Sequence, residues 1–177
     1  MSTATLTTAR TLLYDPWEHV AELGIEVNAT NLPGYMVAAT DAKAIWIDKR
    51  LFTWEATNAL AHEIVHWELG HSTAQPAWIE RSVNALTVSR LYPDWLLERA
   101  PMETMCGRDV NAWLYEETGR QMTGGQLQDM AGLGGTGVWG DLRNCTKGFD
   151  GSCEHGRQYP KSSRTRDWLS LISGRLS

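Results

Sequence analysis

The sequence predicts an α+β fold, in which a small, mostly antiparallel sheet packs on a long helix and extra helices follow toward the C-terminus. Three observations predict this fold. Short apolar and polar alternations fall within the first fifty residues, a stretch without Gly or Pro follows at 53–69, and further helical segments with clear stop signals come after it. The 177 residues suffice for one compact domain with its own core.

The first elements are delimited by cap and turn residues. Asp15 is a good N-cap and is followed by a proline, so a short helix is expected to run to about Leu23 and to end at Gly24. In the residues that follow, apolar and polar side chains alternate as they do in strands, and Pro-Gly and charged turns separate these stretches. Strands are therefore expected at 25–27, 35–39 and 44–48.

The helices that follow are bounded by glycine and proline. The longest is expected at 53–69, because Gly70 is a natural stop. The next begins at Pro76 or Ala77 and continues to residue 92, where Pro93 ends it. Shorter helices are expected at 94–99, 108–118 and 165–172.

The C-terminal part differs from the rest in composition. Residues 132–140 are rich in glycine, so we divide the chain into a main domain, 1–131, and a Gly-rich link with a basic tail, 132–177, as a small appendage. Residues 143–177 hold seven of the 16 Lys and Arg but three of the 21 Asp and Glu. Such a tail is either a solvated segment or a contact arm for an acidic partner.

Composition and charge exclude several functional classes. The net charge of −5 gives no overall basic field, so nucleic acid is not an expected partner except through the basic tail. No apolar run approaches the roughly 20 residues that span a membrane, and the N-terminus lacks the pattern of a secretory signal. Three cysteines are too few for a disulfide framework. A cytoplasmic protein without a membrane partner is expected.

The most informative motif is His-Glu-Ile-Val-His at 62–66. Helical residues four apart differ by about 40° in direction, so His62 and His66 leave one face and can bind one metal ion. Zinc suits two such imidazoles, and Glu63 lies beside the metal as a general base toward water. Fewer than about one chain in a hundred of this length would contain this motif by chance. The alternative is two surface histidines on an amphipathic helix.

A catalytic zinc site needs a third protein ligand. Glu80 is the best candidate, since it lies in the first turn of the next helix, and a helical hairpin would bring that turn near the metal. Asn84, one turn further, could bond the outer nitrogen of a ligand histidine. His71 is about 140° around a continuing helix, so it is either a ligand swung back by Gly70 or a cap of the helix end. The remaining candidates are Glu98 and Glu103.

The sequence around this motif resembles the ImmA/IrrE family of zinc metallopeptidases, in particular its short actinobacterial and phage members. The family shows HExxHxxxGH followed by a helix of the form ExxAN, and the matching stretches here are HEIVHWELGH at 62–71 and ERSVNALTVSRLYP at 80–93. Val83 departs from the pattern, standing at the alanine. The resemblance extends over about residues 14–95, including DPWEHVAELGIEV at 15–27, LPG at 32–34 and AIWIDKRL at 44–51.

The resemblance implies a zincin-like, gluzincin-type core with zinc ligands at His62, His66 and Glu80 and with Glu63 as catalytic base. It further implies an endopeptidase that cleaves a regulatory protein, a helix-turn-helix repressor of a mobile element or phage, in the host cytoplasm. In zincins an edge strand pairs with the extended substrate, and 45–48 is the strand expected to do so, unless it is interior. The alternatives are a non-proteolytic zinc-binding regulator and a phage structural or assembly protein on a degenerate peptidase core.

A second group of metal-ligand residues lies mainly in the basic tail. Thiolates and imidazole bind zinc, so these residues are a candidate structural site for a second ion, although their spacing is not that of a standard finger. Unreactive thiols or a disulfide are the alternatives. The residues are Cys106, Cys145, Cys153 and His155. Tyr92, Tyr115 and His155 are candidate stabilisers of the transition state, and nothing in their spacing selects one.

Overall fold

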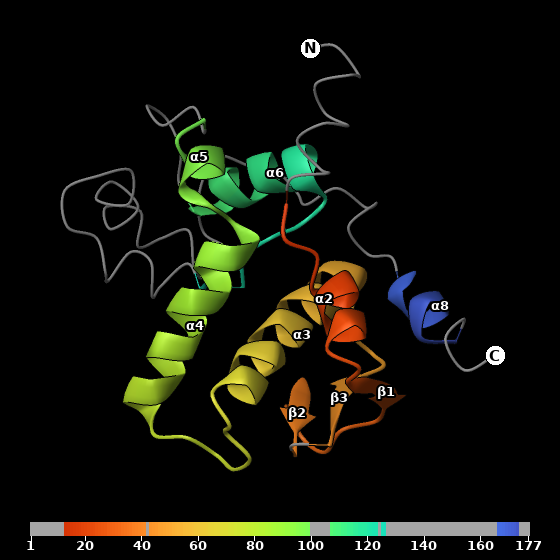
Figure 1. The fold of residues 1–177 in the computed structure, drawn as a ribbon. Coiled ribbons are helices and arrows are strands. Elements are labelled where there is room, and N and C mark those ends of the chain that lie inside the picture. Colours follow the sequence, from red (N-terminus) through yellow and green to blue (C-terminus); the bar gives the residue numbers. More distant parts are fainter. Residues whose placement is uncertain (1–12, 42, 100–106, 124, 127–165, 174–177) are drawn as a thin grey trace. The chain divides into compact units, whose positions relative to one another are not determined.

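The computed structural model of the chain describes residues 13–41, 43–99, 107–123, 125–126 and 166–173. These residues fall into two compact units, one with 14–87 and 166–173, the other with 88–126 and Leu13. Figure 1 shows their helices and strands, which make the fold α+β as predicted. In chain order they are α2 (Pro16–Glu22), β1 (Glu26–Thr30), β2 (Ala38–Thr40), β3 (Ala44–Asp48), α3 (Thr53–Glu68), α4 (Ala77–Leu91), α5 (Asp94–Leu97), α6 (Gly107–Thr118) and α8 (Trp168–Ser173).

The sheet has three strands in the order β1-β3-β2. β2 runs antiparallel to β3, with Ala39 opposite Trp46, but β1 runs parallel to β3, with Val27 opposite Ile45. The prediction of a mostly antiparallel sheet is therefore wrong, and the sheet is mixed. The chain reverses direction between β1 and β2 and again between β2 and β3, so β1 and β3 point the same way. Because β3 lies between the other two strands, it pairs with β1 in parallel and with β2 antiparallel.

The strand order also corrects the expected edge strand. β3, the strand predicted at 45–48 to pair with a substrate, is the central strand, with both of its sides bonded to neighbours. Its burial fits this place, since Ile45 and Ile47 are fully buried. A five-residue apolar strand has the same alternation at an edge and in the centre, so the pattern could not distinguish them.

One hydrophobic core holds the first unit together. Ile45 and Ile47 project from β3 toward α3, which also contacts β2, and α2 contacts both α3 and β1. At the centre the indole Nε1 of Trp17 donates to Thr57 Oγ1 at 3.1 Å. The buried members of this core are Trp17, Val20, Ile25, Ile45, Ile47, Ala56, Leu60, Ile64 and Trp168.

Helix α8 belongs to this same core (Figure 1). Trp168 is completely buried, and its Nε1 donates to the Leu51 carbonyl at 3.0 Å. Arg166 donates from Nε to the Arg50 carbonyl at 3.1 Å and lies over the Phe52 ring, 5.0 Å from its centroid. Residues 166–173, within the predicted C-terminal tail, therefore pack on the first unit. The predicted boundary at 131/132 itself lies outside the described residues.

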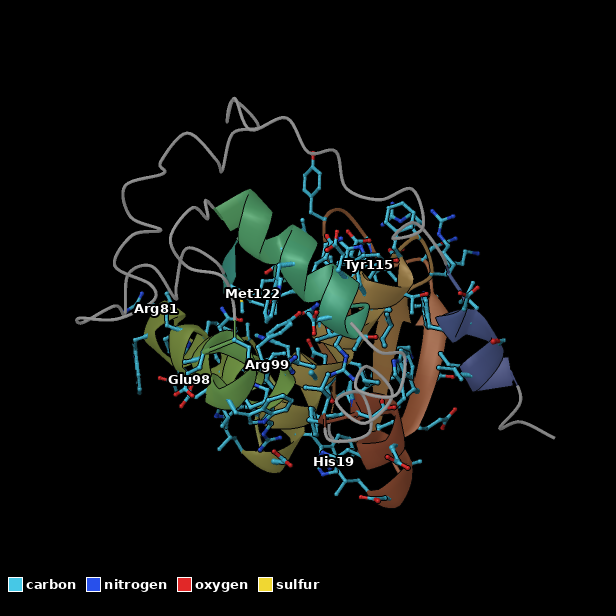
Figure 2. The ribbon with its side chains drawn as sticks, turned by 90° about the horizontal axis from the view of Figure 1, so that it is seen from above. His19, Arg81, Glu98, Arg99, Tyr115 and Met122 are labelled. Carbon is cyan, nitrogen blue, oxygen red and sulfur yellow. The ribbon has the colours of Figure 1, made fainter. Side chains whose placement is uncertain are left out.

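The second unit is built around α5 and α6. The side-chain amide of Asn111 on α6 makes two bonds to the main chain of Met122, accepting at 2.9 Å and donating at 2.8 Å. Arg99 and Glu117 form an ion pair with an N–O distance of 3.6 Å. Figure 2 labels Arg99, Tyr115 and Met122 of this unit. Among all the helices described, none is long and apolar enough to cross a membrane.

Candidate metal centre

Helix α3 places the two motif histidines side by side. The Phe52 amide at its start donates to the Glu55 carboxylate at 2.8 Å, which satisfies one of the free N–H groups of the first turn. Leu60 and Ile64 are fully buried in the core. His62 and His66 leave α3 together as predicted, with ring centroids 4.7 Å apart and Nε2 atoms 3.0 Å apart.

Helix α4 adds a carboxylate to this pair. Glu80 lies in its first turn, and its Oε2 is 3.4 Å from Nε2 of His62 and 3.4 Å from Nε2 of His66. The three atoms form a triangle with sides of 3.0, 3.4 and 3.4 Å. Ligand atoms at about 2.0–2.1 Å from a tetrahedral zinc ion lie roughly 3.3–3.4 Å apart. The three residues, chosen from the sequence as metal ligands, can therefore hold one metal ion.

Asn84 sets the proton position on His62. Its Oδ1 lies 3.0 Å from Nδ1 of His62, and a carboxamide oxygen can only accept, so the proton of the neutral imidazole is on Nδ1. Nε2 then keeps its lone pair and faces the other two donor atoms. Asn84 lies one helical turn after Glu80, so α4 presents both a candidate ligand and the residue that bonds the outer nitrogen of His62.

The surroundings keep both histidines in the form that binds metals. Burial lowers the pKa of His62, and its neighbour His66 lowers it further. The pKa of His66 is also lowered by burial in the first place. At neutral pH both rings are therefore uncharged, with nitrogen lone pairs available to a cation.

Glu63 has the opposite shift. Its side chain is buried in α3, 9% exposed, and burial, followed by the negative charge of Glu80, raises its pKa to about 7. A carboxyl group with a pKa near the working pH can both accept and return a proton, as a general base must. The catalytic role of Glu63 itself stays a prediction.

His71 makes a contact that the sequence did not predict. It lies outside the group of three metal donors, and its amide caps the end of α3 by donating to the His66 carbonyl at 2.9 Å, which agrees with the capping alternative. In addition, its Nδ1 lies 3.0 Å from Nδ1 of His66. The signal was present in Gly70, whose positive φ of 70° turns the chain back toward α3. A continuing helix would have placed the ring on another side.

The other predicted site residues do not belong to the unit that holds this centre. Tyr92 is buried in the second unit, and Tyr115 and Glu98 belong to the same unit (Figure 2). The remaining candidates lie outside the described residues, and the second metal site stays a prediction. They are Glu103, Cys106, Cys145, Cys153 and His155.

Comparisons with known protein families, with curated proteins and with solved structures find no match for this chain.

Proposed function

We propose that this chain is a zinc-dependent endopeptidase with a zincin-like core. The observation that carries the proposal is the triangle of Nε2, Nε2 and Oε2 atoms from His62, His66 and Glu80, next to the buried carboxyl group of Glu63. Two imidazoles and one carboxylate are a common ligand set of catalytic zinc, which leaves one position open. A binding site without catalysis would have no use for a buried carboxyl group at Glu63.

The site residues have different roles in the proposed peptide hydrolysis. Zinc held by the three ligands would polarise the scissile carbonyl group and acidify an attacking water molecule. Glu63 takes the proton of that water and returns it to the departing amine, for which its pKa near 7 is suited. Asn84 keeps the His62 ring in its ligand orientation during this cycle.

The edge of the sheet offers a place for an extended substrate. The Asp48 amide donates to the Val37 carbonyl at 2.9 Å, and Ala39 is the register partner of Trp46. Because main-chain groups alternate along a strand, those of Ala38 and Thr40 face away from β3. A peptide could pair with them as a further strand, with β2 in the role first assigned to β3.

The substrate class follows from the resemblance to ImmA/IrrE peptidases. We propose that the chain cleaves a regulatory protein, a helix-turn-helix repressor of a mobile element or phage, in the cytoplasm of the host. Such an enzyme needs a protein substrate but no DNA contact of its own. The uneven charge, with seven Lys and Arg but three Asp and Glu after residue 142, is compatible with a tail that contacts an acidic partner.

The test compares zinc-loaded wild type with Glu63→Gln, which keeps the three ligands and removes the base. Both are incubated with a proteome-derived peptide library and with the candidate repressor as an intact protein, and new amino termini are identified by mass spectrometry. Cleavage by wild type alone supports an endopeptidase. Zinc binding without cleavage in either case contradicts it and favours a non-proteolytic regulator. A wild-type protein that binds no zinc favours a structural or assembly role.

A further inference from the structure

The end of α3 forms a defined turn that returns the chain to the metal centre. The Gly70 amide donates to the Trp67 carbonyl at 3.0 Å, and the His71 amide donates to the His66 carbonyl at 2.9 Å. This pair of bonds around a residue with positive φ is a Schellman motif. It ties the main chain of His71 to that of His66, so the two side chains start from fixed, adjacent positions.

The two rings then meet through their Nδ1 atoms. The Nδ1–Nδ1 distance is 3.0 Å, and the ring centroids are 5.2 Å apart at an angle of 58°. Nitrogen atoms of two uncharged rings at 3.0 Å need either a proton or a metal ion between them. In the metal-bound site the ion serves the Nε2 pair of His62 and His66, so the Nδ1 pair of His66 and His71 shares a proton, one ring donating and the other accepting. Nε2 of His66 faces His62 and Glu80 and must keep its lone pair to bind a metal ion. The donor is therefore Nδ1–H of His66, and the acceptor is Nδ1 of His71.

We propose that His71 is a positioning residue for His66, accepting its Nδ1–H and so holding the ring in the tautomer and orientation that bind the metal. This inference rests on the proposed metal centre and adds a residue to it. His71 is not a ligand and takes no part in proton transfer to substrate. Its role is the one that Asn84 has toward His62, supplied from the turn after α3 instead of from α4.

The parallel with Asn84 identifies a conservative replacement. Oδ1 of asparagine and Nδ1 of histidine are both one bond beyond Cγ, so an asparagine at position 71 can present an acceptor where Nδ1 now lies. The chain already uses this pair at the other ligand, where Asn84 Oδ1 faces His62 Nδ1 at 3.0 Å. An alanine at position 71 presents no acceptor. His71→Asn therefore removes the imidazole but keeps a hydrogen-bond acceptor, whereas His71→Ala removes both.

The experiment measures zinc affinity of the full chain by competition with a chromophoric chelator, for wild type, His71→Ala, His71→Asn and His19→Ala. Removing the partner of a ligand histidine typically weakens metal affinity about 10–100-fold, which is expected for His71→Ala. His71→Asn is expected to stay within about threefold of wild type. His19 lies on α2 (Figure 2) and bonds Tyr14, so His19→Ala is the matched control and should not change the affinity.

A second readout reports the hydrogen bond directly. In the zinc-loaded protein, long-range ¹H–¹⁵N NMR correlations should show His66 protonated on Nδ1, and this proton should exchange slowly with solvent in wild type and in His71→Asn but faster in His71→Ala. The same spectra show whether each variant is folded, so a folding defect is not mistaken for loss of the hydrogen bond.

Each outcome separates the two proposals. A wild-type chain that binds no zinc overturns the metal centre and, with it, this inference. Zinc binding by wild type with unchanged affinity in His71→Ala overturns the role of His71 alone. Equal losses in His71→Ala and His71→Asn, with the exchange rate of the His66 Nδ1 proton unchanged, also overturn it, because the hydrogen bond would then not be the cause.

Discussion

The indole rings of Trp17 and Trp168 stack with their centroids 5.8 Å apart and their planes at 28°. Trp17 is on α2, before the sheet, and Trp168 begins α8, close to the C-terminus. Both belong to the core that also contains Leu60 and Ile64 of α3, the helix that carries His62 and His66. The support of α3 therefore depends on residues from both ends of the described chain.

Trp168→Ala should destabilise the first unit strongly. The substitution removes a fully buried ring together with its bond to the Leu51 carbonyl, so a loss of about 3–5 kcal/mol in the free energy of unfolding is expected. Urea denaturation measures it. Leu171→Ala on the same helix is the control, since that side chain is 47% exposed, and should cost less than about 1 kcal/mol. Equal effects of the two would mean that α8 does not pack as described.

Zinc should stabilise the folded chain through Glu80. A ligand that binds only the folded state, present at about 100 times its dissociation constant, adds about 2.7 kcal/mol to the free energy of unfolding. Wild type should show this gain with zinc and lose it with a chelator, whereas Glu80→Ala should show little of it. Arg81→Ala, an exposed neighbour on α4 (Figure 2), should behave as wild type. A full zinc effect in Glu80→Ala would exclude Glu80 as a ligand.

Glu63 should make the zinc-free protein less stable as pH rises. Its folded pKa, about 7, lies above the ordinary value of 4.5, so the folded state holds its proton where the unfolded state has lost it. Its contribution is therefore most favourable below pH 4.5, falls as pH rises to about 7 and is constant above that.

Glu63→Gln removes this dependence. The difference in unfolding free energy between zinc-free Glu63→Gln and zinc-free wild type should shift in favour of the variant between pH 4 and pH 8. The expected shift is on the order of 2–3 kcal/mol. Thermal or urea unfolding across this range gives the difference directly. The histidines of the site are present in both proteins, so their titration cancels in the comparison. A difference that does not vary with pH would show that Glu63 is not buried as an acid.

Gly70→Ala should destabilise the turn that carries His71. At a φ of 70° an alanine costs about 1–2 kcal/mol, although nothing lies within 4 Å of the added Cβ. Gly70→Asn should cost less, because asparagine tolerates the left-handed region. Unfolding free energies test the order glycine, asparagine, alanine. If alanine proved as stable as glycine, the turn would not need the left-handed conformation.

Local sequence determined the helices and the direction of the ligands along them. The capping Asp15, the stop at Gly70 and the proline at 93 gave helix limits that agree with the structure to within a few residues, because these signals act on the nearest turn of the chain. The spacing of His62 and His66 placed both rings on one face for the same reason. Glu80 and Asn84 were found from their place on the next helix and from the resemblance of that helix to a known family.

Only the tertiary structure decided which distant residues meet. The 3.4 Å approach of Glu80 to both histidines depends on how α4 lies against α3, and the central place of β3 depends on which strands pair. Neither is encoded in one stretch of sequence, since a short apolar strand can sit at an edge or in the middle. Likewise, Trp168 packs in the core although it lies in the predicted C-terminal tail, and His71 contacts His66 because the turn at Gly70 brings it back to α3. These outcomes follow from packing and hydrogen bonding between residues far apart, which local patterns do not specify.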